Sequence, residues 1–203
     1  MTIHKFERTD AGREEWLDAR RGKVTGTRVK DLIVKRGNKE KKGFWEIIAE
    51  RVAIPPTEEN AMSRGLRIED EAIRRFEEKT GKTVNNDCVL ICRDDNSDIA
   101  YSPDGTIGET ESVEVKCLNS ASHIEAYITK EIPSEYEEQY IQPFVVNDNL
   151  ETLYFVFYDP RMPIDIFFFE VKRADIADKI TACHEQQLLS LAKIADIEKQ
   201  LTF

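Results

Sequence analysis

The sequence predicts an α/β fold in which a central mixed β-sheet is flanked by helices. Apolar residues recur at helical spacing up to about residue 80 and again from about 175 to 201, whereas the segment between them contains the period of strands. Strands enclosed by helices in this order are typical of a mixed sheet covered by helices. The 203-residue chain has no repeat or convincing linker, so we expect one domain over 1–203. Its expected parts are a helical portion (about 1–80), a sheet core (about 81–172) and a C-terminal helix (about 173–203).

The N-terminal helices are indicated by their caps and breakers. "TDAGREEWLDARRG" predicts a helix capped by Thr9 or Asp10 and ended by Gly22. A second helical stretch covers about 25–34, and "FWEIIAERV" predicts a third helix that ends because two prolines follow it. In "AMSRGLRIEDEAIRRFEEKTG" apolar residues recur at helical spacing, so we expect an amphipathic helix that ends at Gly81.

Strand patterns follow this helix. "TVNNDCVLIC" and "IAYS" lead to "SVEVKC", which predicts a meander with Gly and Asn at its turns. "SHIEAYITK" and "PSEYEEQYIQPFVVN" predict helices, and "TLYFVFYD" and "IDIFFFEVK" predict two strongly apolar strands. A long helix from about 175 to 201 closes the chain.

Composition limits the expected location and the chemistry of the cysteines. No apolar run approaches the roughly 20 residues that span a bilayer, and "MTIHKFERTD" lacks the apolar centre of a signal peptide. We therefore expect a cytoplasmic protein with no membrane partner. The cysteines lack the paired spacing of a zinc site or a disulfide framework, so they are predicted to be buried thiols: Cys88, Cys92, Cys117 and Cys183.

The charge of the chain is unevenly distributed. Residues 1–52 contain 14 Lys and Arg against 9 Asp and Glu, a net charge of +5, and residues 53–203 contain 15 against 30, a net charge of −15. A basic N-terminal portion can attract a phosphate backbone locally even though the whole chain carries −10. An ordinary solvated surface explains the same counts, so charge alone leaves both interpretations open.

The stretch "YSPDGTIGETESVEVKC" carries the candidate chemistry. Glu114 and Lys116 alternate with two valines, so their side chains share one face of a strand. If "DGTIGETES" forms a hairpin, Asp104 converges with them. Two carboxylates beside an amine suit Mg²⁺, with Lys116 orienting or deprotonating the attacking water. A surface ion pair that follows a Pro-Asp-Gly turn is the alternative.

Several further segments occur in the order of one nuclease family. "SPDG" followed by "EVK" matches the PD-(D/E)xK nuclease signature, and it is accompanied by "WLDARRGKVTGT", "GLRIE", "YEEQ" and "FYDPRM". Over about residues 16–162 the sequence resembles a lambda-type phage exonuclease of the YqaJ-like viral recombinase family. The ordered set is far more specific than any one piece. The resemblance implies a restriction-endonuclease-like core.

The resemblance also implies roles for individual residues around a metal ion. Asp104 and Glu114 would be metal ligands, Lys116 the catalytic lysine, and the carbonyl of Val115 a further ligand. Glu69, on its helix, would be an additional ligand. From the residues alone, Glu69 is explained as an exposed carboxylate on the solvated face of an amphipathic helix.

The remaining implied residues would contact the DNA substrate. Gln139 would lie against the active centre, but Ile141 stands where the family usually has a second glutamine, and Gln142 is displaced by one. Whether Gln139 or Gln142 serves the site therefore stays open. A pocket for a 5′-terminal phosphate would be formed by Arg20, Thr27 and Ser102. "YDPRM" is interpreted as a structural turn at a strand end.

The activity implied is that of a Mg²⁺-dependent 5′-to-3′ exonuclease, with Mn²⁺ as a substitute. It would digest one strand of linear double-stranded DNA and leave 3′ single-stranded tails for recombination by strand annealing. The implied partners are DNA ends and a single-strand annealing protein, and the implied assembly is a ring-shaped homotrimer, encoded by a phage or prophage. An endonuclease or DNA-repair nuclease of the same fold, and a DNA-binding or assembly module without catalysis, are the alternatives.

Overall fold

The described chain forms two compact units, each with its own core. The computed structural model describes residues 11, 14–15, 42–54, 61–87 and 89–201. One unit, which we call the sheet unit, comprises residues 59–117, 131–158 and 166–203, and the other, the helical unit, comprises residues 1–58, 118–130 and 159–165. The second helical stretch expected at 25–34 lies outside the described residues, while Ala11, Glu14 and Glu15 of the first are helical.

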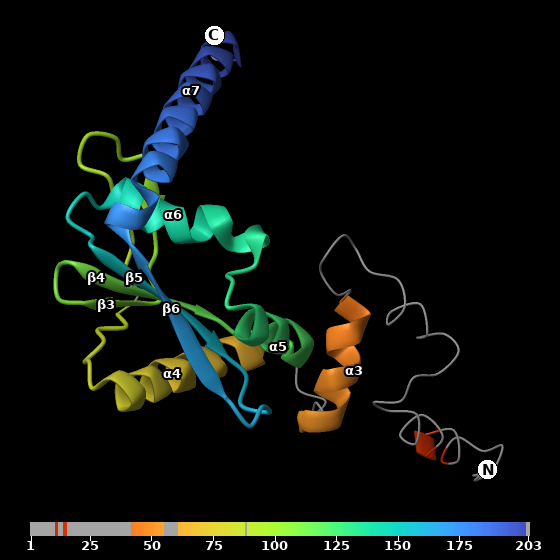
Figure 1. Ribbon diagram of the computed structural model, residues 1–203. Coiled ribbons are helices and arrows are strands. Elements are labelled where there is room, and N and C mark those ends of the chain that lie inside the picture. Colours follow the sequence, from red (N-terminus) through yellow and green to blue (C-terminus); the bar gives the residue numbers. More distant parts are fainter. Residues whose placement is uncertain (1–10, 12–13, 16–41, 55–60, 88, 202–203) are drawn as a thin grey trace. The chain divides into compact units, whose positions relative to one another are not determined.

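The sheet unit is built on four strands in the order β3-β4-β5-β6 (Figure 1). Their bounds are β3 (Gly105–Ile107), β4 (Glu111–Lys116), β5 (Thr152–Tyr158) and β6 (Ile166–Lys172). β4 and β5 are parallel, and the other two pairs are antiparallel. A parallel pair needs a long crossover, and the chain between β4 and β5 supplies one with two helices. The predicted mixed sheet flanked by helices is confirmed.

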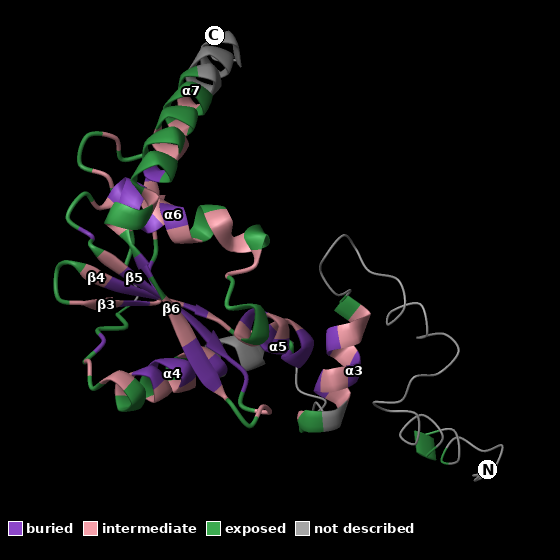
Figure 2. Ribbon diagram, viewed as in Figure 1, coloured by how far each residue is buried: buried purple, intermediate pink, exposed green. Residues whose placement is uncertain are grey.

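β5 is one of the two inner strands of the sheet, and both of its faces are apolar. All of its residues after Thr152 are buried (Figure 2). On one face Tyr154, Val156 and Tyr158 pack with the valines of β4 and with helix α4 (Ala61–Thr80). α4 contributes the apolar stripe predicted from its helical spacing: Ile68, Ala72, Ile73 and Phe76. The helix ends before Gly81, whose φ of 71° is a left-handed conformation that glycine adopts without strain.

The other face of the sheet is covered by the short helix η1 (Ser134–Tyr136) and by α6 (Glu137–Val146). Their tyrosines pack on Phe155 and Phe157 of β5. After β6 the chain passes through η2 (Arg173–Ile176) into the long helix α7 (Ala177–Leu201), which packs against α6. The helices predicted within 133–147 and from about 175 to 201 are confirmed as α6 and α7.

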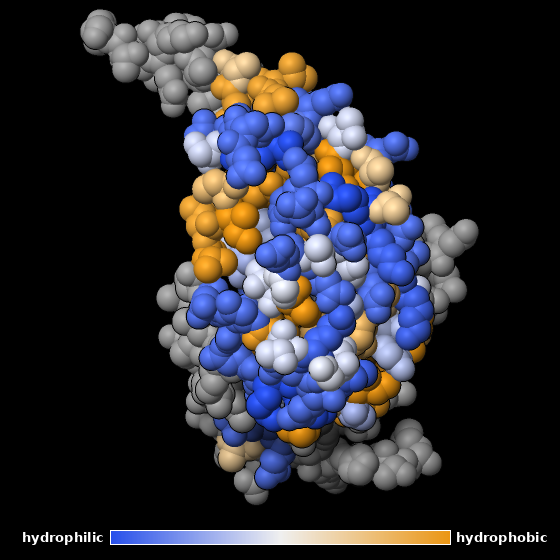
Figure 3. Space-filling view, turned by 90° about the vertical axis from the view of Figure 1, so that its left-hand side faces the viewer, coloured by the Kyte–Doolittle hydropathy of each residue, from blue (hydrophilic) through white to orange (hydrophobic). Residues whose placement is uncertain are grey.

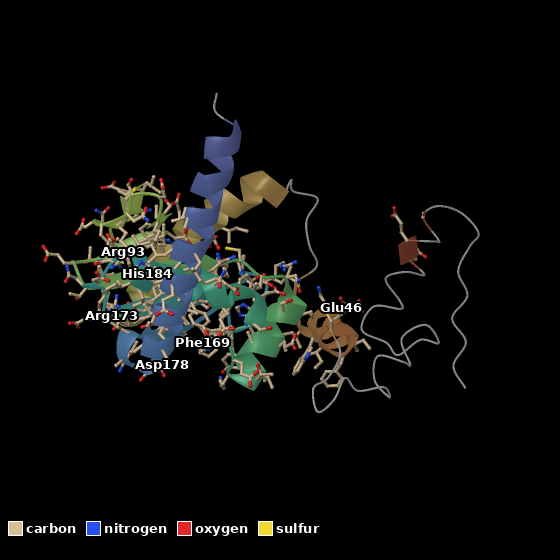
Figure 4. All side chains as sticks on the ribbon, turned by 90° about the horizontal axis from the view of Figure 1, so that it is seen from above. Glu46, Arg93, Phe169, Arg173, Asp178 and His184 are labelled. Carbon is tan, nitrogen blue, oxygen red and sulfur yellow. The ribbon has the colours of Figure 1, made fainter. Side chains whose placement is uncertain are left out.

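Two arginines fix the end of α6 (Figure 4). Arg93 donates to both carboxylate oxygens of Asp148, at 2.8 and 3.1 Å, and to the carbonyl of Val145. Arg173 donates to the carbonyls of Phe144 and Leu150, at 2.8 and 2.7 Å. The bonds to Phe144 and Val145 satisfy carbonyls that a helix end otherwise leaves without partners, and the bond to Leu150 ties Arg173 to the turn before β5.

The segment predicted as a strand at 83–92 is mostly irregular. Among its described residues, only β1 (Ile91–Cys92) forms a strand, paired with β2 (Ala100–Tyr101), and Asn85 forms an isolated bridge with Thr106. The side chain of Asn85 accepts a hydrogen bond from the backbone of Asp87, a local bond that competes with strand pairing. The prediction of buried thiols is wrong for Cys92 and Cys117, which are exposed because they lie on an edge ribbon and just past the end of β4.

The helical unit contains α3 (Lys42–Val52) and α5 (Ser120–Thr129). Its core consists of apolar side chains from both helices: Trp45, Ala49, Ala121 and Ile124. The loop 159–165, which includes "DPRM", is organised by Asp159. This carboxylate is 1% exposed and accepts from Ser120 Oγ and from the Arg161 guanidinium, the latter at 2.8 and 2.9 Å.

The surface is largely hydrophilic on the face shown in Figure 3, with apolar residues in separate small areas. Isolated exposed apolar residues of this kind are normal on a folded chain. Within the described part of the chain, no helix combines the length and the apolar character that crossing a bilayer requires.

Candidate functional site

The hairpin of β3 and β4 places Asp104 beside β4. Gly105 pairs with Val113, so Glu114, Val115 and Lys116 extend beyond the paired end of the hairpin. Asp104 fills this open position, and its Oδ2 accepts from the backbone N–H of Val115 at 2.7 Å. The glycine that follows is required by space, because a Cβ at Gly105 would lie 2.3 Å from Val84 Cγ1. An aspartate followed by glycine therefore lets β3 begin close to Val84 while the carboxylate bonds to the backbone of β4.

Glu114 and Lys116 lie together on the face opposite the valines, as their alternation predicts. The Lys116 ammonium contacts Glu114 Oε1 at 2.6 Å, and the two side chains are 22% and 15% exposed. Both side chains are therefore largely shielded from water, unlike those of the surface ion pair that the sequence left as an alternative.

Glu69 approaches from α4 and is half-buried. Burial is the main cause that raises the pKa of Glu69, and the charge of Asp104 raises it further, while Lys116 lowers it. Burial also raises the pKa of Asp104, against the hydrogen bond from Val115 and the charge of Lys116. The pKa of Glu114 is raised by burial and then by Asp104. The charge of Lys116 lowers the pKa of all three carboxyls, but it does not offset the effect of burial on any of them.

The donors at this point match those that a hard divalent cation takes. The N–H and C=O of a strand residue point to the same side, so the Val115 carbonyl faces the side where its N–H meets Asp104. Among the described residues, no three His, Cys, Asp or Glu side chains are already gathered as a metal-binding cluster. Carboxylates repel one another without a cation between them, and here Asp104 and Glu114 are held by the protein's own donors. The excess negative charge and the carbonyl fit a divalent ion.

The other predicted site residues lie just before Asp104, on α6, or outside the described residues. Ser102 is exposed, and its hydroxyl donates to the carbonyl of Val89. Gln139 is exposed on α6. Gln142 is hydrogen-bonded at both ends of its amide, which donates to the carbonyl of Ala100 at 3.1 Å and accepts from Gln187 at 2.6 Å. Arg20 and Thr27 lie outside the described residues.

Sequence reasoning missed the aromatic surroundings of this site. The Lys116 ammonium lies 5.8 Å from the ring centroid of Tyr136 and 6.0 Å from that of Phe155. The sequence marks Tyr136 only as the first residue of "YEEQ", and no local pattern connects Phe155 with Lys116. The available signal is the alternation of β5, but only the strand register shows which of its residues face the site.

Comparison with known proteins assigns the fold. The sequence pattern of the YqaJ-like viral recombinase domain matches residues 15–147. The crystal structure of LHK-Exo, an alkaline exonuclease from Laribacter hongkongensis, is 30% identical to this chain with a TM-score of 0.54, and the match covers 93% of this chain and 100% of that chain. The structure of LHK-Exo in complex with dAMP matches with 29% identity, the same TM-score and the same coverage. No curated protein matches the chain.

The chain therefore belongs to the YqaJ-like viral recombinase family. Its fold is that of the alkaline exonuclease LHK-Exo, and the family and these neighbours together identify it as a nuclease.

Proposed function

We propose that the chain is a Mg²⁺-dependent 5′-to-3′ exonuclease that digests one strand of linear duplex DNA. The observation that carries the proposal is the placement of Asp104 on the backbone N–H of Val115, beside the Glu114–Lys116 ion pair of the same hairpin. This arrangement offers oxygen donors for a metal and an amine beside them. The 3′ single-stranded tail that remains would be the substrate of an annealing protein in recombination.

The oxygen donors and the lysine would have different roles in the reaction. Asp104, Glu114 and the Val115 carbonyl would hold the ion, with Glu69 as a further donor. A bound Mg²⁺ supplies Lewis-acid polarisation of the phosphate and a more acidic water. Lys116 would orient the attacking water or offset the charge that develops on the phosphate.

A ligand of a structural neighbour supports one class of product. LHK-Exo has been solved in complex with dAMP. A deoxynucleoside monophosphate is what an exonuclease releases when it cuts one nucleotide at a time from an end. We infer that this chain releases the same class of product.

The test of the activity is end-labelled linear duplex incubated with and without Mg²⁺, beside covalently closed circular duplex. We expect the 5′-ended strand to shorten only with the metal and the circle to stay intact. Cleavage of the circle would indicate an endonuclease instead. Lys116→Ala should be inactive and still bind metal and DNA, since Lys116 is not a ligand.

Direction requires a second site, because the metal centre alone does not choose an end. We propose that Arg20, Thr27 and Ser102 bind the 5′-terminal phosphate. Ser102 lies two residues before Asp104, which supports a pocket near the cutting point. A charge-assisted contact predicts that 5′-phosphorylated duplex is degraded about ten-fold faster than 5′-hydroxyl duplex. Arg20→Ala should narrow this preference, and equal rates in the unmutated protein would contradict the pocket.

The assembly proposed is a homotrimeric ring around DNA, which follows from the family resemblance. Light scattering should give a mass near three chains without DNA. A monomer at micromolar concentration would contradict the ring but not the proposed metal-dependent cleavage.

A further inference from the structure

The face of the sheet that carries Glu114 and Lys116 is lined by phenylalanines. In the parallel register of β4 and β5, Glu114 pairs with Phe155 and Lys116 with Phe157. Directly paired residues point to the same face. β6 continues the row with Phe169 beside Phe155 and Phe167 beside Phe157 (Figure 4 labels Phe169). The ion pair therefore borders an apolar floor.

Two tyrosines cover this floor. The ring centroid of Tyr136 lies 5.9 Å from that of Phe155 and 6.5 Å from that of Phe157. Tyr140, one turn later, lies 6.3 Å from Phe155 in an edge-to-face arrangement. Both tyrosines are half-buried. They therefore contribute similar packing to the same aromatic cluster.

The two tyrosines differ in the cation that each contacts. The Lys116 ammonium lies 5.8 Å from the ring centroid of Tyr136 and the Lys179 ammonium 5.9 Å from that of Tyr140. A cation within about 6 Å of an aromatic centroid is attracted by the ring quadrupole. Lys116 is thus held on one side by Glu114, at 2.6 Å, and on the other by Tyr136 and Phe155.

We propose that Tyr136 is a positioning residue that holds the Lys116 ammonium at the site when Glu114 ligates a metal ion. The inference rests on the proposed function of these residues. A carboxylate that ligates a divalent cation attracts a neighbouring ammonium less, and the flexible stem of lysine then lets the ammonium leave. The attraction of the rings does not change when the metal binds. Phe155, on β5, and Tyr136, in η1, are the two rings that contact the ammonium.

Three variants separate positioning from packing. Tyr136→Leu removes the ring beside Lys116, and Tyr136→Phe keeps the ring and removes only the hydroxyl. Tyr140→Leu is the matched control, because it removes the same kind of side chain from the same cluster but leaves the ring beside Lys116 in place. Circular dichroism and Tm identify a temperature at which all variants are folded. If Tyr136→Leu does not fold, Tyr136→Met replaces it.

The experiment measures kcat and KM for Mg²⁺-dependent cleavage of linear duplex. We expect Tyr136→Leu to lower kcat by about 5- to 30-fold with KM within about two-fold, and Tyr136→Phe and Tyr140→Leu to stay within about two-fold in both. Equal losses in Tyr136→Leu and Tyr140→Leu, or a loss in Tyr136→Phe as large as in Tyr136→Leu, would overturn the inference. An unmutated protein without cleavage would overturn the proposed function instead, so the two failures are distinct.

Discussion

Asp159 in the helical unit and Asp104 in the sheet unit are both withdrawn from water, but their partners differ. Asp159 accepts from Ser120 Oγ, from the Arg161 backbone N–H and twice from the Arg161 guanidinium. Asp104 accepts from the backbone N–H of Val115 and shares the charge of Lys116 with two other carboxylates. One carboxylate is compensated within the protein, and the other is left with excess charge.

The pKa values move in opposite directions as a result. Burial alone would raise the pKa of Asp159, but the hydrogen bonds from Arg161 and Ser120 outweigh burial and hold it below its ordinary value. Burial raises the pKa of Asp104, and the bond from Val115 and the charge of Lys116 do not compensate. A compensated buried carboxylate stabilises a fold, whereas an uncompensated one costs stability and marks a place where a cation or substrate belongs.

The largest expected effect tests the uncompensated carboxylate. Asp104→Asn should lower Mg²⁺-dependent cleavage by about 100-fold or more, because the metal contributes several kcal/mol to the reaction. Its Tm without metal should be equal to or above that of the unmutated chain, since the amide oxygen can still accept from Val115 and the charge is gone. Nuclease assay and thermal melting measure the two effects. Near-normal cleavage would remove Asp104 from the metal site.

The opposite outcome is expected for the compensated carboxylate. Asp159→Asn should lower the free energy of unfolding by about 3 kcal/mol, because it leaves the shielded Arg161 guanidinium without its charge partner. Urea unfolding measures the loss. Glu170→Gln is the control, since Glu170 is exposed and should change stability by less than about 0.5 kcal/mol. Equal stability of the two variants would show that Asp159 is not a structural anchor.

Metal and pH should act on the sheet unit through the same carboxylates. Glu69, Asp104 and Glu114 have raised pKa values in the folded chain, so their protonation stabilises the fold at low pH. That contribution is lost as the pH rises from about 4, their ordinary range, through the raised values. At neutral pH, Mg²⁺ at 100 times its Kd should restore about 2.7 kcal/mol. Thermal melts across pH, with and without Mg²⁺, check both effects. A Tm of the unmutated chain that does not change when Mg²⁺ is added would contradict the metal site.

The smallest effect distinguishes the two glutamines of α6. Gln142→Ala should lower stability by about 1 kcal/mol, because it removes bonds to Ala100 and Gln187. Gln139→Ala should leave stability within about 0.5 kcal/mol, since Gln139 is exposed. If Gln139 serves the site, only its variant lowers kcat at a temperature where both are folded. Loss of activity in Gln142→Ala alone would reverse the assignment.

Local patterns were sufficient for most elements of the fold. The apolar runs of β5 and β6, the helical spacing of α4 and the long α7 were predicted because their periods follow from burial of one or two faces. The strand predicted at 83–92 forms only at Ile91–Cys92 among the described residues of that segment, because side-chain bonds such as that of Asn85 compete with pairing and composition does not reveal them.

The sequence alone determined that Glu114 and Lys116 share a face, because alternation in a strand is a local property. It also determined the family, through the order of its motifs. Only the tertiary structure decided that Asp104 accepts from the N–H of Val115, that Glu69 on α4 feels the charges of Asp104 and Lys116, and that Tyr136 and Phe155 border Lys116. These contacts depend on the register of parallel strands joined by a long crossover and on how α4 and α6 pack on the sheet, and a linear pattern contains neither.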